Sequence, residues 1–178
     1  MHLPDRFLPE KIVLRSLTPA DAAPLARLAD NKKIWDNLRD YIPFPYRESD
    51  ARAFIAHVLK EKPQQTFAIS HEGVLCGVTG LVAQQDVYRR SAEMGFWLGE
   101  PYHGRGIATR AVALITAYAF KELKLVRVFA AVFDHNTASM RVLEKNGYLK
   151  EGIFRKAVYK NGRLLDEHRY AILNEAAL

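Results

Sequence analysis

The sequence predicts an α/β (α+β) fold, in which helices pack on both faces of a mixed, mostly antiparallel sheet. Two observations support this prediction. Strand-like and amphipathic helical segments follow one another in the order β-α-α, a run of strands, then β-α-β-α-β-β. A glycine loop also joins a short apolar strand to a long apolar-faced helix within Glu93–Phe120. The 178 residues contain no linker, repeat or low-complexity segment, so we expect one domain over residues 1–178.

The first part of the chain predicts an edge strand and two helices. The strand is expected over Lys11–Leu17, where apolar residues alternate with others. Thr18 begins the first helix, because it can act as N-cap, Pro19 suits the first turn, and the acid at Asp21 resembles a capping box. Ser49-Asp50 is expected to cap the second helix.

Most of the remaining chain predicts strands. We expect them at Gln65–Ser70, Val74–Gln84, Ser91–Leu98, Val126–Phe133, Tyr148–Phe154 and Asp166–Leu173. The first three indicate an antiparallel meander, and Val126–Phe133 is apolar on both faces, which favours a central position. A short helix over Ala138–Asn146 ends at Gly147, and Val158–Leu165 is expected to form a hairpin with an Asn161-Gly162 turn.

Composition limits the classes of protein to consider. The single cysteine, Cys76, allows no internal disulfide and suits a reducing compartment. No leader and no apolar run of membrane-spanning length is visible, so we expect a soluble, cytoplasmic protein that does not bind membranes. The net charge of +6 favours anionic partners, but the basic residues are spread along the chain. We therefore expect no direct nucleic-acid binding.

The glycine loop of Glu93–Phe120 predicts an anion site. Backbone N–H groups at the start of a helix point toward one place and carry the positive end of the helix dipole, which suits phosphate. A nucleotide triphosphate loop does not fit, because Arg105 replaces its lysine and Gly106 its hydroxyl residue. A dinucleotide fingerprint does not fit either, because Thr109 occupies its third glycine position.

A pyrophosphate cradle fits the same residues better. The stretch Gly104–Thr109 offers consecutive N–H groups with no bulky side chain at the closest approach. Arg105 and Arg110 can supply positive charge to a pyrophosphate. Asn136 follows the next strand, where its amide can meet a ligand that lies between the two strand ends.

Motifs along nearly the whole chain resemble the GNAT N-acetyltransferases, in particular the branch that contains the ribosomal-protein alanine N-acetyltransferases of Rim type. They are L-R-S-L-T-P-A-D-A, W-D-N-L-R-D-Y-I-P-F-P-Y, E-M-G-F-W-L, H-G-R-G-I-A-T, N-T-A-S-M-R-V-L-E-K-N-G-Y and Y-K-N-G-R-L-L-D-E-H-R-Y. The resemblance implies that acetyl-CoA binds in a V-shaped splay between the fourth and fifth strands. It also implies transfer of the acetyl group to a primary amine by direct attack in a ternary complex.

The resemblance also assigns cofactor residues. Pantetheine would pair with the backbone of Phe96, Trp97 and Leu98. Pyrophosphate would sit on the N–H groups after Gly104, and the full set of this loop is His103, Gly104, Arg105, Gly106, Ile107, Ala108 and Thr109. His103 stands where the family usually has Gln or Arg. On the other side, Asn136 and Ser139 would contact the pantetheine, and Lys145 would reach the adenosine phosphate.

Two residues are candidates for proton transfer. Glu93 opens the cofactor strand and is the candidate base, acting directly or through a water; the alternative is a solvent-facing strand residue. Many relatives carry a tyrosine as general acid where this chain has Leu143, so Ser139 is the candidate acid. The alternatives are an ordinary helix hydroxyl, or a thiolate that leaves without an acid. A backbone N–H near Trp97–Leu98 would stabilise the oxyanion.

The acceptor pocket is expected to contain Trp35, Tyr41, Phe44, Glu93 and His168. The alternative is that the aromatic side chains of the loop, including Tyr46, pack it onto the core and that His168 is structural. The acceptor amine is a peptide N-terminus or a small molecule. The histidines and the lone cysteine show no metal-site spacing, so no metal is expected. The alternative function is a non-catalytic module with the same fold that binds acyl-CoA or associates with RNA. The protein is expected to be a monomer or a homodimer.

Overall fold

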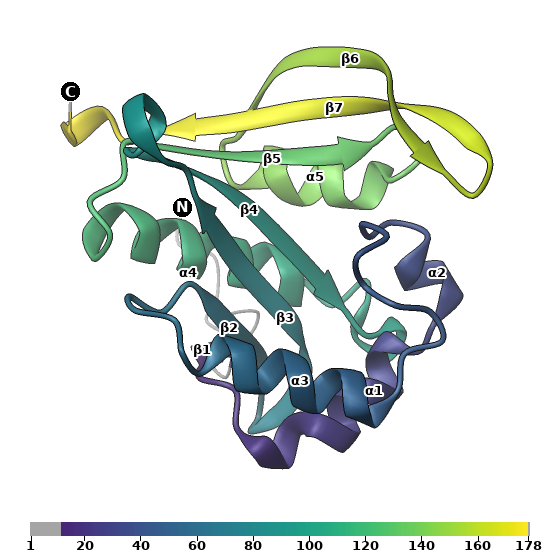
Figure 1. Cartoon of the computed structure of the whole chain (residues 1–178). Helices are drawn as coiled ribbons and strands as arrows, with labels where there is room; N and C mark the ends of the chain where they lie inside the picture. Colours follow the sequence, from purple (N-terminus) through teal and green to yellow (C-terminus); the bar gives the residue numbers. More distant parts are fainter. Residues whose placement is uncertain (1–11, 178) are drawn as a thin grey trace, which may run out of the picture.

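The computed structural model describes residues 12–177. Within this range seven strands form one sheet in the order β1-β2-β3-β4-β5-β7-β6 (Figure 1). The strands are β1 (Ile12–Arg15), β2 (Thr66–His71), β3 (Val74–Ala83), β4 (Ser91–Leu98), β5 (Arg127–Phe133), β6 (Leu149–Lys160) and β7 (Arg163–Leu173). All neighbouring pairs of these strands are antiparallel except β4 and β5. The predicted mixed, mostly antiparallel sheet is confirmed.

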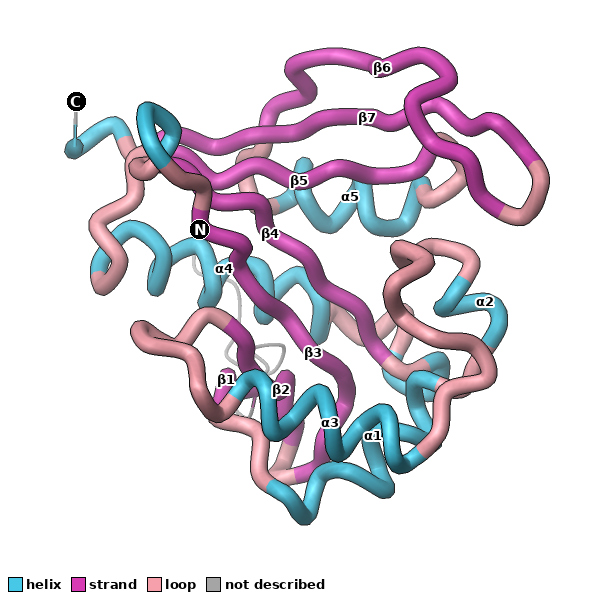
Figure 2. Tube along the Cα trace, in the orientation of Figure 1, coloured by secondary structure: helices cyan, strands magenta, loops and turns pink. Residues whose placement is uncertain are grey.

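Helices cover both faces of the sheet, as predicted (Figure 2). The larger helices are α1 (Ala22–Ala29), α3 (Glu48–Val58), α4 (Ile107–Lys121) and α5 (Thr137–Lys145), and a short α2 spans Lys32–Trp35. One buried cluster joins α1 and α3 to β2 and β3, whereas a second joins α4 and α5 to β4, β5 and β7. The sheet therefore has a hydrophobic core on each side.

The parallel pair β4 and β5 separates soon after it begins. Only three residue pairs connect the two strands, ending at Glu93 opposite Phe129. β4 continues to Leu98 along β3, whereas β5 continues to Phe133 along β7. Figure 1 shows the two strands diverging toward the side where α2 lies. This divergence is the splay that the family resemblance implied.

Side-chain alternation explains why β5 lies inside the sheet. Val128, Ala130 and Val132 are buried in the cluster that contains α4, while the residues between them are half-buried on the opposite face. Met94 of β4 and Ile115 of α4 belong to the same cluster. Burial of this apolar surface holds α4 across the divergent strands.

Three local predictions need correction. The second helix begins at Glu48 with Arg47 as N-cap, because Asp50 occupies its N3 position and accepts from the Arg47 N–H at 2.8 Å. The aromatic loop contains the unpredicted α2, which Asn31 caps through the Lys33 N–H. The predicted hairpin over Val158–Leu165 is present, but it is the end of one long hairpin, β6–β7, in which β6 continues from Leu149 to Lys160 through two register shifts. Lys11, predicted as the start of the first strand, lies outside the described residues.

The predicted capping box at the first helix is present and is tied to β1. Asp21 is 6% exposed and accepts hydrogen bonds from the Thr18 N–H at 2.8 Å and from both terminal nitrogens of Arg15 at 2.7 and 2.8 Å. The Arg15 guanidinium holds the pKa of the Asp21 carboxyl below its usual value of 3.8. One carboxylate therefore connects the first strand to the first helix.

Asp21→Asn is expected to lower the unfolding free energy at neutral pH by about 1–3 kcal/mol, because a buried ionic hydrogen-bond network is lost. Since the folded-state pKa is lowered, this contribution is complete above the unfolded pKa of about 4 and disappears as pH falls through the folded value. Urea unfolding of both proteins at several pH values measures the difference. The exposed Glu122→Gln variant is the control; a difference that stays constant down to pH 2 contradicts the assignment.

Candidate active site

A cavity of about 530 Å³ occupies the splay between β4 and β5. Its walls come from β3, β4 and β5, from the loop before α3, and from the start of α5. The predicted site residues among its lining are Tyr41, Glu93, Phe96, Trp97, Asn136 and Ser139. The structure therefore brings together residues that lie almost a hundred positions apart in the chain.

One edge of β4 faces this cavity without a strand partner. Beyond Glu93, β4 pairs with β3 on one side, and within residues 12–177 no strand pairs with its other side. Backbone polar groups at such an edge can accept an extended ligand as an additional strand. The Leu98 side chain is buried in the core, so only the backbone of this residue is available to a ligand there.

The predicted glycine loop follows β4 directly. Gly104 and Gly106 have φ values of +71° and +74°, and Gly106 is the N-cap of α4. A Cβ atom at either glycine would meet no atom within 4 Å, so the loop backbone faces open space. Arg105 is exposed between them, and the His103 ring Nε2 lies 2.9 Å from the Leu98 carbonyl oxygen. This arrangement presents the first N–H groups of α4 to a ligand.

Of the remaining loop residues, Ile107 is buried under the first turn of α4, and Ala108 and Thr109 are half-buried. Neither these residues nor the loop before them line the cavity. Lys145, at the last position of α5, is exposed and does not line it either. The glycine loop therefore lies outside the cavity and follows it along the chain, after the end of β4.

Glu93 lies in the cavity with its side chain 19% exposed. Its Oε1 atom forms an ion pair with Arg39, which comes from the loop between α2 and α3. The sequence analysis did not include Arg39 in the site. The only sequence signal was an arginine within an otherwise aromatic and proline-rich stretch.

Two other candidates meet at the start of α5. Asn136 is the N-cap of this helix, and its side-chain oxygen accepts from the Ser139 N–H at 3.2 Å. Both residues are half-buried and line the cavity. The capping bond uses the amide oxygen of Asn136, which leaves its NH₂ group as the donor toward a ligand.

The predicted acceptor residues separate into two groups. Tyr41 lines the cavity and is 79% exposed. Trp35 and Phe44 do not line it; their ring centroids lie 5.5 Å apart, and Trp35 donates from Nε1 to the Ile42 carbonyl at 2.8 Å. His168 lies on β7 and also does not line the cavity. Trp35 and Phe44 therefore shape the loop that carries Tyr41.

Tyr46 is a lining residue that the predicted site did not include. It is 9% exposed, and burial raises the pKa of its phenol to about 12. The phenol therefore keeps its proton at neutral pH. Its place in the aromatic loop was the available sequence signal, but that signal did not distinguish a lining residue from a packing one.

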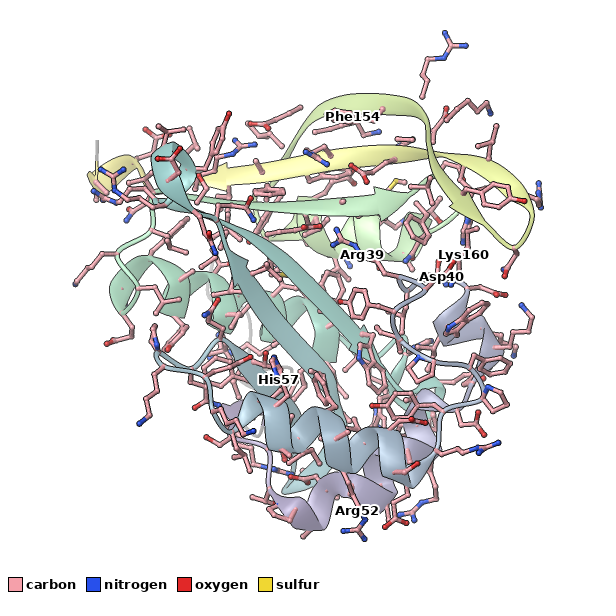
Figure 3. All side chains as sticks on the ribbon, in the orientation of Figure 1. Arg39, Asp40, Arg52, His57, Phe154 and Lys160 are labelled. Carbon is pink, nitrogen blue, oxygen red and sulfur yellow. The ribbon has the colours of Figure 1, made fainter. Side chains whose placement is uncertain are left out.

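A buried lysine braces the loop over the cavity. Lys160, at the end of β6, is 3% exposed, and its Nζ lies 2.6 Å from Asp40 Oδ1 and 3.3 Å from the centre of the Trp35 ring. Asn161 adds a 2.8 Å hydrogen bond to Asp36. Figure 3 shows Arg39 beside this contact between Asp40 and Lys160. The tip of the β6–β7 hairpin thereby fixes the loop that carries Arg39 and Tyr41.

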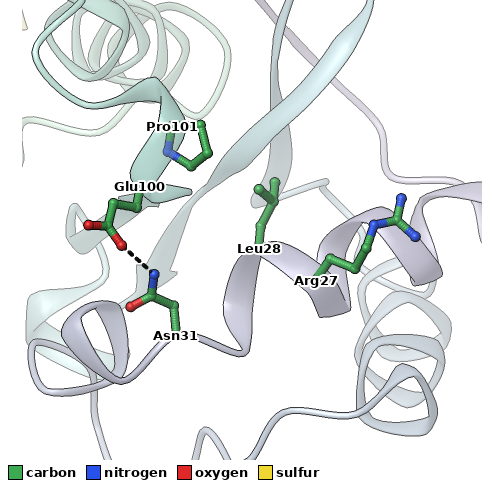
Figure 4. Close-up of a pocket in the computed structure, with 5 residues that line it drawn as sticks. All are labelled: Arg27, Leu28, Asn31, Glu100 and Pro101. Carbon is green, nitrogen blue, oxygen red and sulfur yellow. Dashed lines mark hydrogen bonds between the residues drawn. The ribbon is translucent and has the colours of Figure 1, made fainter.

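A second, smaller hollow of about 370 Å³ lies between α1 and the loop after β4 (Figure 4). Its carboxylate, Glu100, is already bound by Asn31 at 2.8 Å and by Lys33 at 2.6 Å. The Lys33 ammonium is the main cause that lowers the pKa of Glu100. With Glu100 occupied in this way, Arg27 is the remaining charged side chain that lines the hollow, which has no second carboxylate, unlike the cavity in the splay.

Among the residues that the structure describes, no helix combines the length and apolar character that crossing a bilayer requires. Within the same residues, no three histidine, cysteine, aspartate or glutamate side chains are grouped to hold a metal ion.

Comparison with known proteins identifies the family. Residues 11–149 match the family model described as the Acetyltransferase (GNAT) domain. The chain belongs to this family. Its GNAT relatives are acetyltransferases, and the resemblance inferred from the motifs is confirmed.

Individual GNAT proteins match over different lengths. The putative ribosomal N-acetyltransferase YdaF of Bacillus subtilis (strain 168) is 32% identical over 171 residues, which cover 92% of each protein. The probable N-acetyltransferase YjcK of the same organism is 51% identical over 85 residues, which cover 48% of this chain and about half (47%) of that relative. The structure of Mycobacterium smegmatis RimJ in complex with CoA-disulfide superposes with a TM-score of 0.82 at 25% identity, covering 93% of this chain and 83% of that one.

Lys160→Met is expected to lower the unfolding free energy by about 1–3 kcal/mol, because the hydrogen bond from the buried ammonium to Asp40 and its cation–π contact with Trp35 are both lost. Hydrogen exchange should also become faster in residues 32–46, which the lysine braces. Chemical unfolding and exchange measured by mass spectrometry test both effects. Lys121→Met, an exposed lysine of α4, is the control. Unchanged exchange in residues 32–46 would show that the loop does not depend on Lys160.

Proposed function

We propose that this GNAT protein transfers the acetyl group of acetyl-CoA to a primary amine by direct attack within a ternary complex. The observation that carries the proposal is the cavity in the splay, with Glu93 at its inner end and the glycine loop beyond the other end of β4. Glu93 and Leu98 are five residue steps apart on an extended strand, or about 17 Å. This distance suits an extended arm that connects a phosphate group to a reactive thioester.

The described residues fit this cofactor at three places. The free edge of β4 at Phe96, Trp97 and Leu98 can pair with the amides of pantetheine. The N–H groups from Arg105 to Thr109 can bind the pyrophosphate, in open space above two glycines of positive φ. Asn136 and Ser139 face the arm from α5, while His103 keeps its contact with Leu98 and shapes the loop. Lys145 is assigned to the adenosine phosphate.

Catalysis would use groups at the inner end of the cavity. Acetyl-CoA supplies the activated thioester. Glu93 takes the proton of the acceptor amine, directly or through a water, and a backbone N–H near Trp97–Leu98 binds the developing oxyanion. Ser139 donates a proton to the leaving sulfur. These roles answer the chemistry, because amine attack requires a neutral nucleophile and produces negative charge first at the carbonyl oxygen and then at the leaving sulfur.

The acceptor would enter past the loop that carries Tyr41, with Trp35 and Phe44 supporting that loop. His168 stays in the proposed pocket as the neighbour, on β7, of the lining residue Glu167. YdaF is named a putative ribosomal N-acetyltransferase, so protein N-termini are the first acceptors to test, beside small-molecule amines. The protein would act as a monomer or a homodimer, without a metal ion.

Glu93→Gln is expected to lower kcat about 100- to 10,000-fold, the usual contribution of a general base, with little change in acetyl-CoA affinity. Release of free thiol measures turnover, and calorimetry measures binding. Glu48→Gln, an exposed carboxylate on α3, is the matched control. If the wild-type protein binds acetyl-CoA but releases no thiol with any amine of a broad panel, the protein is a non-catalytic acyl-CoA-binding module instead.

Gly106→Ala is expected to weaken acetyl-CoA binding about 5- to 30-fold. An alanine at φ +74° is strained by roughly 1–2 kcal/mol, and relief of this strain would turn the loop N–H groups away from the phosphates. Gly152→Ala is the control, because Gly152 lies on β6 with no atom within 4 Å of an added Cβ. Equal dissociation constants for the two variants would remove the glycine loop from the binding site.

A further inference from the structure

Arg39 is distinguished by its charge. Among the described residues that line the cavity, it is the one lysine, arginine or histidine. Its side chain is 54% exposed, and the contact with Glu93 Oε1 comes from one terminal nitrogen, Nη2. Because a guanidinium carries five N–H donors, several remain available to a ligand in the cavity.

The other charged lining residues are already occupied. Asp50 accepts from the Arg47 N–H at the start of α3. Glu167 accepts from Arg169, two residues further along the same strand, at 2.5 Å. The ion pair between Glu93 and Arg39 is therefore the charged feature that remains to recognise an acceptor. This ion pair places a carboxylate, which can take a proton, next to a fixed cation.

Arg39 is held in place by its neighbours in the loop. Its carbonyl oxygen accepts from the Ile42 N–H at 3.1 Å, and the same Ile42 accepts from the Trp35 indole. The adjacent Asp40 is fixed by Lys160. The guanidinium thus projects from a braced loop, and a rigid position is what a specificity residue requires.

We propose that Arg39 determines acceptor specificity by binding a carbonyl or carboxylate oxygen next to the acceptor's amine, while Glu93 binds the amine itself. This inference rests on the proposed acetyl transfer and adds the group that selects the acceptor. The pair presents a negative carboxylate beside a positive guanidinium. An α-amino acyl compound carries the complementary groups, an amine beside an oxygen that accepts hydrogen bonds. Both contacts are charge-assisted hydrogen bonds, the stronger kind.

The same geometry disfavours polyamines. An acceptor with a second ammonium near the first would bring that charge toward Arg39, and like charges in a partly desolvated site repel. A simple alkylamine brings no oxygen to Arg39 and leaves its free donors without a protein or ligand partner. Selectivity for α-amino acyl acceptors therefore arises because Arg39 attracts the acyl oxygen of these acceptors and repels the second ammonium of a polyamine.

The test compares four acceptors with wild-type protein and Arg39→Gln: an alanine-initiated tripeptide, free alanine, ethylamine and spermidine. Ethylamine is alanine without its carboxylate, so the kcat/KM ratio of either alanine compound to ethylamine isolates the oxygen contact. The tripeptide and free alanine distinguish a carbonyl from a carboxylate as the recognised group. Arg52→Gln, on the exposed face of α3 and paired with Glu48, is the matched control (Figure 3).

The wild type is expected to favour an alanine compound over ethylamine and spermidine. Arg39→Gln should reduce the alanine-to-ethylamine ratio about 10- to 100-fold, the effect of one lost charge-assisted hydrogen bond, and Arg52→Gln should keep the ratio. Turnover with an unchanged ratio in Arg39→Gln, or a wild-type preference for spermidine, overturns this inference and leaves acetyl transfer intact. Absence of turnover with every amine tested contradicts the proposed function itself, and the inference with it.

Discussion

The early end of pairing between β4 and β5 is the constraint on which the other features depend. Three residue pairs join these parallel strands, and beyond Glu93 the two halves of the sheet follow different neighbours. The halves remain together because α4 packs across them in one buried cluster. The separation exposes the edge of β4, creates the cavity and places Glu93 at its inner end. A sheet with complete β4–β5 pairing would have none of these features.

Contacts from distant parts of the chain complete the opening that the strands create. The hairpin β6–β7 extends past the sheet, and the buried Lys160 at its tip bonds to Asp40, 120 residues away. This contact adds a distant anchor to a loop that is held locally by its own hydrogen bonds, such as the one from Trp35 to the Ile42 carbonyl. Because the loop supplies Arg39 to Glu93, the β6–β7 hairpin and β4 are linked through one loop.

Local patterns accounted for much of the fold because the interactions involved are local. The capping box at Thr18 and the Asn161-Gly162 turn depend on residues within four positions, and both occur as expected. The N-cap of the second helix is Arg47 rather than the expected Ser49, because Asp50 caps from the N3 position inside the helix. The continuity of β6 through residues 155–157 was missed because bulges, one of them beside Lys156 with φ +54°, interrupt the alternation that indicates a strand.

The sequence by itself determined the family, the order of the strands and helices, and the glycine loop, since each depends on a motif or on a period of consecutive residues. The roles of individual site residues stay predictions. Tertiary structure alone decided that Arg39 meets Glu93 from 54 positions away and that Trp35 packs under Lys160 rather than in the cavity. The physical reason is that ion pairs and desolvation depend on which surfaces the packed elements bring together. No pattern of neighbouring residues specifies such contacts between distant positions.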